Sequence, residues 1–257
     1  MTANSPHRSL AGKRILVVGA SAGIGRAFAT IAGTEGARLV LAARRADRLD
    51  EAVAEAGGDA VPVVGDVRSE QDCRRIGSVT QQTLGNVDIV LISTGFAPLK
   101  MFADTTAQDW LDVFETNVIG VHQVIRSVLS VLTPSAIVAA LSSDSVRHHH
   151  PALGAYSASK AAMERCIDQW RLEHPGYRFS CVEVGGTVPT DFTSSFDPDL
   201  LSTAATDWFR RGLIREERMT PTAVAEVLAG VFASAIDQPG VGLEQLSVLS
   251  PTGPMLS

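Results

Sequence analysis

Cysteine and long apolar stretches are both scarce in this sequence, and each shortage excludes a class of protein. The three cysteines are an odd number and no two of them form a CxxC pair, so we expect reduced thiols in a cytoplasmic protein rather than a disulfide framework or a metal site. No apolar run approaches the roughly 18 residues of a membrane-spanning helix, and residues 1–14 lack the apolar core of a signal peptide. We therefore expect no membrane association.

Positive charge is scarce as well. The chain has 22 lysines and arginines against 28 aspartates and glutamates, a net charge of −6 at pH 7, and its arginine pairs at 44–45 and 210–211 are too short to form a polybasic arm. We therefore expect no nucleic-acid partner. Linkers rich in proline, glycine or serine are also absent, which predicts a single domain over residues 1–257.

Short apolar runs alternate with longer segments of helical period along most of the chain. The runs of strand length cover residues 14–18, 38–42, 60–64, 88–92, 136–141, 179–184 and 244–249. The helical segments begin near Gly23, Asp47, Ser69, Thr106, Tyr156 and Thr220. This alternation predicts an α/β fold in which right-handed β-α-β units build a doubly wound parallel sheet with helices on both faces. We expect the first six strands to be buried on both faces.

The segment 107–132 is predicted to be a helix with an unusually wide apolar arc. Its apolar residues cover more of the helix circumference than the single stripe that a core-facing helix needs. Two explanations remain open. The helix is either deeply buried, or packed on the sheet by one side and on a partner subunit by the other, as in a homodimer or homotetramer.

The sequence VVGASAGIGRA follows the first predicted strand directly and opens a helix. In this context Gly19 permits a tight turn, Gly23 lets the backbone approach a pyrophosphate, and Gly25 allows close packing of the helix on the strand. The N-terminus of the helix offers unpaired N–H groups and the positive end of its dipole to the anion. The predicted cofactor-binding residues of this loop are Gly19, Ser21, Ala22, Gly23, Ile24 and Gly25.

The residues after the second strand indicate which dinucleotide binds. A site for NAD usually has a carboxylate about 20 residues beyond the loop, which accepts hydrogen bonds from the ribose 2′-hydroxyl. This chain has Arg44 and Arg45 there. A guanidinium suits the 2′-phosphate of NADP(H), to which Ser21 adds a hydroxyl donor. We therefore predict NADP(H), with Asp66 at its adenine amino group and Val67 among its contacts.

Tyrosine and lysine are rare, yet one of the two tyrosines, Tyr156, lies four residues before one of the three lysines, Lys160. On a helix such residues face the same side, with their Cβ atoms about 5–6 Å apart. A free phenol titrates near pH ~10, but a cation at about 4 Å in an effective dielectric of about 20 contributes up to about 4 kcal/mol, or roughly three pKa units. We therefore expect Lys160 to lower the pKa of Tyr156 toward neutrality, as proton-transfer catalysis requires.

The GxxxGxG spacing of the loop, together with Tyr156-x-x-x-Lys160, resembles the short-chain dehydrogenase/reductase family from Lys13 to about Val248. The resemblance implies a single-domain, Rossmann-type sheet, a nicotinamide cofactor, and reversible hydride transfer between that cofactor and a carbonyl or alcohol. It also implies a catalytic set, which consists of Asn117, Ser143, Tyr156 and Lys160.

The same resemblance implies a role for each of these residues. NADPH gives a hydride to the carbonyl carbon while Tyr156 protonates the oxygen. Ser143, which stands 13 residues before Tyr156, hydrogen-bonds the substrate oxygen where negative charge develops, and Asn117 holds a water that links Lys160 to solvent. Further cofactor contacts implied by the family are Gly95, Gly186, Val188 and Thr190, in addition to Tyr156 and Lys160.

Some positions depart from the family pattern. Residues 92–95 read Ile-Ser-Thr-Gly instead of Asn-Asn-Ala-Gly, residues 185–186 read Gly-Gly instead of Pro-Gly, and the frequent C-terminal Asp-Gly-Gly is absent. These departures keep open a protein that senses NADP without turnover, although a sensor would not need the tyrosine. A reductase of 3-oxoacyl thioesters is the other alternative.

Residues 191–217 fall where the family keeps a mobile substrate lid. The large apolar side chains of this segment are Phe192, Phe196, Trp208, Phe209 and Leu213. They predict a cover over a hydrophobic ketone, aldehyde or secondary alcohol, and the alternative is an ordinary amphipathic helix packed on the core. The run of His148, His149 and His150 lies beside the predicted site. We expect it to lie mostly in solvent, because consecutive loop residues rarely converge on one metal, and contact with the substrate is the alternative that we prefer to a metal.

Overall fold

Seven strands form one parallel sheet within residues 9–215 and 217–251, the part of the chain that this computed structural model describes. The strands are β1 Arg14–Val18, β2 Arg38–Ala43, β3 Val61–Val64, β4 Val87–Ile92, β5 Leu132–Leu141, β6 Arg178–Val184 and β7 Gln245–Val248. Their order is β3-β2-β1-β4-β5-β6-β7, and every pairing is parallel. The chain first runs outward from β1 to β3 and then outward from β4 to β7, so the predicted doubly wound α/β fold is confirmed.

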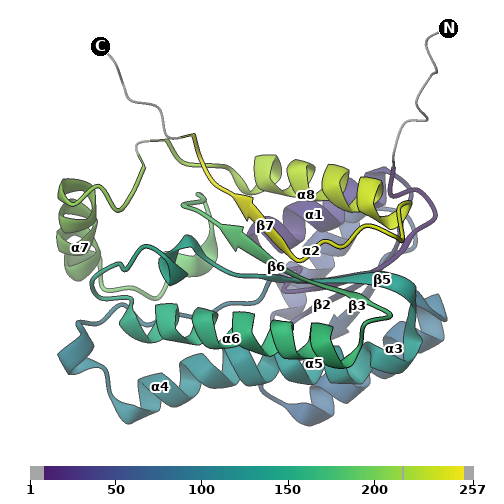
Figure 1. The fold of residues 1–257 in the computed structure, drawn as a ribbon, viewed down its shortest axis with the longest axis horizontal. Coiled ribbons are helices and arrows are strands. Elements are labelled where there is room, and N and C mark those ends of the chain that lie inside the picture. The colour runs from purple at the N-terminus through teal and green to yellow at the C-terminus, as the bar shows by residue number, and fades with distance from the viewer. Residues whose placement is uncertain (1–8, 216, 252–257) are drawn as a thin grey trace, which may run out of the picture.

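Helices cover both faces of the sheet (Figure 1). The α-helices are α1 Gly23–Thr34, α2 Ala46–Ala56, α3 Glu70–Leu84, α4 Ala107–Phe114, α5 Gly120–Val128, α6 Gly154–Glu173, α7 Pro198–Arg210 and α8 Pro221–Ile236. One face carries α1, α2 and α8, the other carries α3 to α6, and α7 lies to one side of both layers. Short 3-10 turns occur at η1 Phe102–Asp104, η3 Leu129–Val131, η4 Asp144–Val146 and η5 Asp191–Thr193. Among the described helices, none is both long and apolar enough to cross a membrane.

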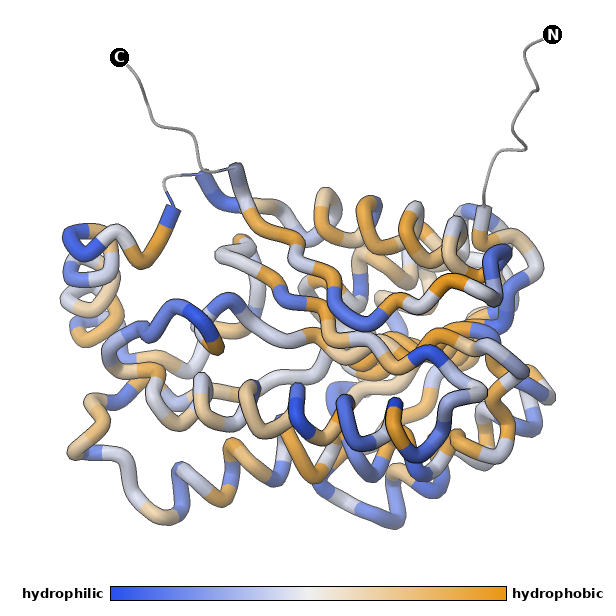
Figure 2. Tube along the Cα trace, in the orientation of Figure 1, coloured by the Kyte–Doolittle hydropathy of each residue, from blue (hydrophilic) through white to orange (hydrophobic). Residues whose placement is uncertain are grey.

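The central strands divide their side chains between two apolar clusters, one under each helical layer. In β1, Ile15 and Val17 join the cluster of α1 and α8, whereas Leu16 and Val18 join the cluster of α3, α5 and α6. Figure 2 shows the same concentration of hydrophobic residues along the strands. This alternation produces the apolar runs from which the central strands were predicted.

The edge of the sheet differs from the prediction. The expectation that the strand at 60–64 is buried on both faces is wrong, because β3 is an edge strand that leaves Pro62 and Val64 exposed. An edge strand tolerates proline, since one of its sides needs no ladder hydrogen bonds. Apolar composition alone does not distinguish such a strand from a central one.

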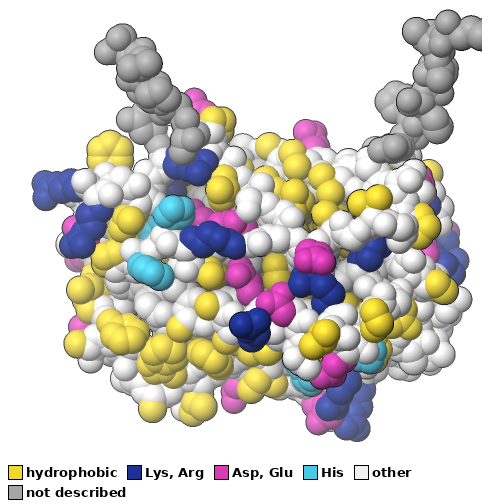
Figure 3. Space-filling view, in the orientation of Figure 1, with side chains coloured by type: hydrophobic (Ala, Val, Ile, Leu, Met, Phe, Trp, Pro, Cys, Tyr) yellow, Lys and Arg dark blue, Asp and Glu magenta, His cyan; other side chains and the backbone are white. Residues whose placement is uncertain are grey.

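The predicted helix at 107–132 is divided in the structure. α4 passes into a π-helical turn, η2 Glu115–Ile119, before α5 begins, and Leu132 already belongs to β5. Val113 and Val124 are fully buried, whereas Leu111 is 55% and Ile119 is 48% exposed. Figure 3 shows hydrophobic side chains gathered on this part of the surface. The explanation of a helix buried all round is therefore wrong, and a partner subunit on the outer side stays a prediction.

Side-chain caps fix where several helices begin. Ser69 and Thr220 each accept a hydrogen bond from the backbone N–H three residues on, and Thr106 forms a capping box with Asp109. α6 begins at Gly154, so Tyr156 lies in its first turn, where the helix meets the carboxyl ends of the strands.

Candidate active site

One cavity of about 570 Å³ opens at the carboxyl ends of the strands. Residues that follow β1 to β6 line its wall, together with residues 191–196 and Trp208 from the chain beyond β6. All of the sequence-predicted site residues line this cavity except Gly25 and Asn117. Parallel strands end at a common edge of the sheet, which is why segments so distant in sequence meet there.

The first part of the wall is a backbone cradle between β1 and α1. A Cβ atom on Gly19 would lie 3.0 Å from the backbone of Ser93 and Thr94, and one on Gly25 would lie 2.4 Å from the carbonyl oxygen of Gly19. Gly19 and Gly23 also have positive φ angles of 88° and 56°, which favour glycine. α1 begins without a side-chain cap, so its first N–H groups can bind an anion. This cradle fits the pyrophosphate of a dinucleotide.

Ser21, Arg44 and Arg45 meet beside the end of β2. Arg45 Nη2 donates to Ser21 Oγ at 3.3 Å, and Arg44 Nη1 lies 3.9 Å from Asp66 Oδ2. Arg68 Nη2 donates to the same Asp66 oxygen at 2.7 Å. Although burial opposes the change, the hydrogen bonds from Arg68 lower the pKa of Asp66. The groups predicted to contact the 2′-phosphate and the adenine thus lie together at one end of the cavity.

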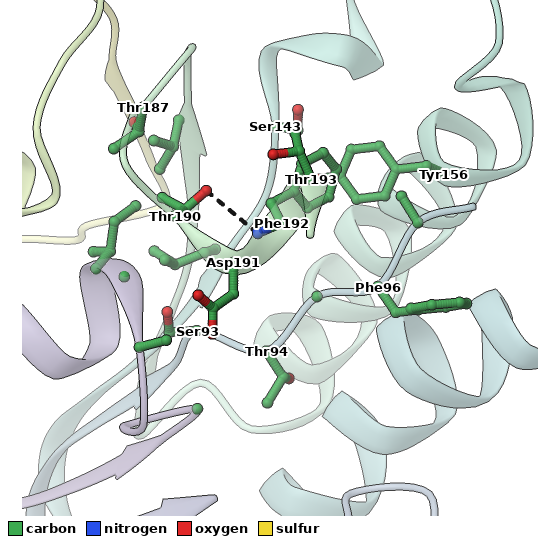
Figure 4. A pocket seen from close by; sticks show the side chains of 18 of the residues that line it. Ser93, Thr94, Phe96, Ser143, Tyr156, Thr187, Thr190, Asp191, Phe192 and Thr193 are labelled. Carbon is green, nitrogen blue, oxygen red and sulfur yellow. Dashed lines mark hydrogen bonds between the residues drawn. The ribbon is translucent and has the colours of Figure 1, made fainter. Parts of the chain in front are cut away.

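A carboxylate that the sequence reasoning missed also belongs to this end. Asp191 begins η5, and Figure 4 shows its side chain directed into the pocket near Ser93 and Thr94. Its carboxylate accepts hydrogen bonds from Arg45 at 2.7 Å and from Arg48 at 3.1 Å, and the bond from Arg45 lowers the pKa of Asp191. The available signal was its position directly after Thr190, a predicted cofactor contact.

Tyr156 and Lys160 lie one turn apart on α6 and both line the cavity. Lys160 Nζ donates to the carbonyl oxygen of Leu141 at 2.7 Å and lies 5.9 Å from the centre of the Tyr156 ring. Ser143 is the second residue after β5, and its Oγ donates to Asp144 Oδ1 at 3.3 Å. Figure 4 shows Ser143 and Tyr156 on the same wall. The structure therefore brings these three predicted side chains together.

The pKa of Tyr156 changes in the direction opposite to the expectation. Burial raises it to about 12, with the charge of Asp144 adding to the rise and the Ser143 hydroxyl opposing it. Burial also lowers the pKa of Lys160 to about 8. The expectation from helical spacing considered only the attraction of the lysine, but Lys160 is 2% and Tyr156 8% exposed, so the burial of the phenol decides the direction of the shift.

Asn117 lies in the π-helical turn η2 and is fully buried. Its Oδ1 accepts from the backbone N–H of Phe96 at 2.8 Å, and its Nδ2 donates to the carbonyl oxygen of Phe96 at 2.8 Å and to Ser159 Oγ at 2.9 Å. These bonds tie the segment after β4 to α6. Asn117 therefore holds two walls of the cavity together, and its role in a water relay stays a prediction.

The loops after β4 and β6 supply the remaining predicted contacts. A Cβ atom on Gly95 would lie 3.7 Å from Lys160 Nζ, and one on Gly186 would lie 2.7 Å from Arg218 Nη1. The N–H of Val188 donates to the carbonyl oxygen of Met219 at 2.9 Å, so its carbonyl is the backbone group left for a ligand. Thr190 Oγ1 accepts a long bond of 3.4 Å from Phe192, which leaves its proton free to donate.

The predicted cover forms, but with fewer aromatic residues than expected. Phe196 and Trp208 are buried, and Phe192 packs on the Tyr156 ring with ring centres 5.0 Å apart. Leu213 packs against the same apolar cluster. Phe209 is 57% exposed, and its inclusion in the cover was wrong. α7 thus directs Trp208 inward and the next residue outward, as helical geometry requires.

The histidine run divides in the same way. His148 and His149 are exposed as predicted, but His150 is buried and lines the cavity. Its Nε2 lies 3.1 Å from the carbonyl oxygen of Leu213, and its ring meets Trp208 edge-on with centres 5.3 Å apart. The expectation that the whole run lies in solvent is wrong for His150. Across the described residues, no cluster of histidine, cysteine and acidic side chains could hold a metal ion.

Comparison with known proteins extends these findings. The sequence model of the short chain dehydrogenase family matches residues 13–201. The chain is 26% identical to an uncharacterised oxidoreductase of Listeria innocua, over 94% of this chain and 98% of that protein. It is 32% identical to the glycine betaine reductase of Emericella nidulans over 76% of this chain, a match that spans only 16% of that much longer protein.

The fold is also similar to that of a solved alcohol dehydrogenase. This enzyme comes from the archaeon Thermococcus sibiricus and was solved in complex with 5-hydroxy-NADP. The two structures share a TM-score of 0.77 at 21% identity, over 92% of this chain and 95% of that one. At this identity the likeness concerns the fold.

Proposed function

Since the chain belongs to the short chain dehydrogenase family and is an oxidoreductase of that family, we propose that it transfers a hydride between NADP(H) and a hydrophobic ketone, aldehyde or secondary alcohol. The supporting observation is a single cavity that the glycine cradle, Ser143, Tyr156 and Lys160 all line. Its cover of Phe192, Phe196 and Trp208 supports an apolar substrate.

The cofactor supplies the hydride when it is bound, and the protein supplies the proton and the electrostatic environment. Tyr156 donates its phenolic proton to the substrate oxygen during reduction and takes it back during oxidation. Ser143 donates a hydrogen bond to the same oxygen as negative charge develops there. Lys160 is held by the Leu141 carbonyl, and when this lysine is protonated its charge favours the phenolate of Tyr156. The apolar cover excludes water and so strengthens these interactions.

The preference for NADP(H) rests on the arginine end of the cavity. Arg45 and Ser21 are already in contact, and together they offer charged and neutral donors to a phosphate. An acid that would instead bind the ribose hydroxyls of NAD is replaced by Arg44 and Arg45 after β2.

Replacing Tyr156 with phenylalanine tests the proposal. Tyr156→Phe keeps the ring that packs on Phe192 and removes the proton, so we expect turnover to fall by roughly 10²- to 10⁴-fold, with NADPH binding nearly intact. Tyr177→Phe is the matched control, because Tyr177 is the other tyrosine and lies between α6 and β6, outside the cavity. Oxidation of NADPH across a panel of ketones and aldehydes, followed by absorbance, is the measurement. Turnover retained in Tyr156→Phe would remove the mechanism.

A further inference from the structure

The segment between Ser143 and Tyr156 places polar atoms on the cavity wall that the proposed reaction does not use. Asp144, Ser145 and His150 all line the cavity. Ser145 is 2% and His150 8% exposed, and within the described part of the chain Ser145 Oγ and His150 Nδ1 have no hydrogen-bond partner. Buried polar groups are nearly always paired, because an unpaired one costs free energy. These atoms therefore indicate a polar ligand group.

The chemistry of that group follows first from His150. Its Nε2 lies 3.1 Å from the carbonyl oxygen of Leu213, and a carbonyl can only accept, so Nε2 carries a proton. In a neutral imidazole the other nitrogen then has no proton and can only accept. The unpaired Nδ1 therefore requires a hydrogen-bond donor.

Asp144 also requires a hydrogen-bond donor, and its carboxylate carries a negative charge. Its carboxylate takes the Ser143 hydroxyl at 3.3 Å, a long bond, and no lysine or arginine within the described residues lies within ion-pair distance of it. The ionisable groups that face it are His150, His148 and Glu183, and with neutral imidazoles the only charge among them is that of Glu183, which repels it. Glu183 is itself occupied by Arg147 and Ser247. A partly buried carboxylate with so little compensation favours a donor, above all a cationic one.

Gly185 leaves Asp144 accessible from the side of β6. A Cβ atom at this position would lie 3.6 Å from Asp144 Oδ2 and 3.1 Å from Leu249 Cδ2. The larger residue expected there from the family pattern would therefore cover part of the carboxylate. The Gly-Gly sequence at 185–186, which replaces the Pro-Gly of the family pattern, thus leaves space beside the Asp144 carboxylate.

We propose that the substrate carries, near its reacting carbonyl or alcohol carbon, a second group that donates hydrogen bonds to Asp144 and His150: a hydroxyl or an ammonium. The inference rests on the proposed function, since it assigns the group to the substrate of that reaction. Ser145 Oγ, which both donates and accepts, completes the site. The aromatic cover binds the apolar remainder of the same molecule, so the substrate is amphipathic rather than purely hydrophobic.

Three matched probes test this inference by binding, without reference to turnover. They are phenyl ketones whose α-carbon carries a methyl, a hydroxymethyl or an aminomethyl group, added to the protein saturated with oxidised NADP at neutral pH. Because a hydrogen bond to a charged group is one of the stronger kinds, we expect one or both donor-bearing probes to bind roughly 10- to 100-fold more tightly than the methyl probe in calorimetry. Preference for the ammonium over the hydroxyl identifies a cationic substrate, and equal binding of the two identifies a hydroxylated one.

Two variants locate the preference. In Asp144→Asn and in His150→Phe, which keeps a ring against Trp208, we expect the donor-bearing probes to lose most of their advantage over the methyl probe. Asp237→Asn and His122→Phe are matched controls that carry the same substitutions outside the cavity, and they should keep the wild-type ratio. If one cavity variant fails to fold, the inference is still tested by the other variant and by the ratio of probe affinities in the wild-type protein.

Equal binding of all three probes to the wild-type protein overturns the inference, and so does an unchanged ratio in both cavity variants. Following NADPH oxidation with the same probes separates this failure from failure of the proposed function. Turnover without a donor preference leaves the oxidoreductase proposal standing and removes the donor site. A donor preference in binding without turnover of any ketone retains the site and removes the proposed reaction.

Discussion

At the proposed cofactor end of the cavity the groups available to a ligand are mainly backbone groups and exposed charges, whereas at the proposed substrate end buried side chains from separate segments converge. The cradle of Gly19, Gly23 and Gly25 is local in sequence, and Arg45 pairs with Asp191 at a partly exposed site. At the other end, Tyr156 and Lys160 are buried on α6 beneath an aromatic cover that arrives from α7 and η5.

This difference decides which kind of interaction is strong at each end. Partly exposed ion pairs are screened by solvent and contribute little to stability, so the structure of the cofactor end depends mainly on the close backbone packing of the glycine cradle. Buried ionisable groups have strongly shifted pKa values, so the substrate end depends on electrostatics. Four further variants test this difference between the two ends, and the effects that we expect decrease from the first to the last.

The buried ammonium of Lys160 makes stability depend on pH. Its pKa is about 8 in the folded protein and ordinary in the unfolded chain, so between about pH 8 and 10.5 the unfolded state binds more protons and stability rises with pH. Relative to Lys160→Met, the free energy of unfolding of the wild type should increase by about 3 kcal/mol across this window. Urea denaturation at a series of pH values measures it. Lys100→Met, at a partly exposed lysine paired with Asp109, is the control and should leave the pH dependence of the wild type unchanged; a similar change there would contradict the assignment.

Adding a single methyl group to the glycine cradle should lower both stability and cofactor affinity. Gly25→Ala places a Cβ 2.4 Å from the Gly19 carbonyl oxygen, so α1 must move away from the loop. We expect a loss of about 1–3 kcal/mol of stability and weaker binding of both NADPH and NADH, measured by urea denaturation and fluorescence titration. Gly242→Ala meets nothing within 4 Å and should be nearly neutral. Equal stability of the two variants would show that the close approach is not required.

Removing a guanidinium should change the choice of cofactor without changing the fold. Arg45→Ala deletes the donor that already contacts Ser21, so we expect affinity for NADPH to fall by about tenfold and affinity for NADH to change little. Arg44→Ala should have a smaller effect in the same direction, because its side chain is more exposed. Arg38→Ala, at the start of β2 and outside the cavity, is the control. Equal affinity for both cofactors in the wild type, unchanged in Arg44→Ala, would defeat the NADP(H) assignment.

The contrast between the two ends also explains what could be predicted from the sequence. Strand positions and the glycine loop follow from local patterns, because apolar runs and a turn between β1 and α1 need no information about distant residues. The edge position of β3 was indicated only by Pro62, since Val61 and Val63 give it the same apolar composition as a central strand. The π-helical turn at η2 likewise lies inside a segment whose apolar spacing predicted one continuous helix.

At the substrate end the side-chain types were predictable but their surroundings were not. The spacing of Tyr156 and Lys160 indicated a shared face, yet the sign of the tyrosine pKa shift depends on burial by Phe192 and on the charge of Asp144. The position of His150 depends on the carbonyl of Leu213, a residue far away in sequence. Such contacts are set by tertiary packing, which a single sequence does not reveal.

The smallest effect concerns a contact between the two ends. Asp191 follows Thr190, a predicted nicotinamide-side contact, but its carboxylate binds Arg45 and Arg48 at the arginine end. A 2′-phosphate and this carboxylate would compete for Arg45, so Asp191→Asn should bind NADPH roughly two- to fivefold more tightly, the range expected for a partly exposed ion pair. Affinity for NADH should not rise, since NADH has no phosphate to gain.

Ionic strength and pH give that effect an independent signature. Salt screens exposed charges, so the advantage of Asp191→Asn over the wild type should shrink as sodium chloride is raised. Because Arg45 lowers the pKa of Asp191, the carboxylate stays charged in mild acid as well as at neutral pH, so mild acid alone should not abolish the difference between the two proteins. Asp207→Asn removes a comparable exposed pair with Arg211 on α7 and should not alter cofactor affinity. Weaker binding of NADPH and NADH alike in Asp191→Asn would instead mean that the acid closes the cover over the cofactor rather than competing with it.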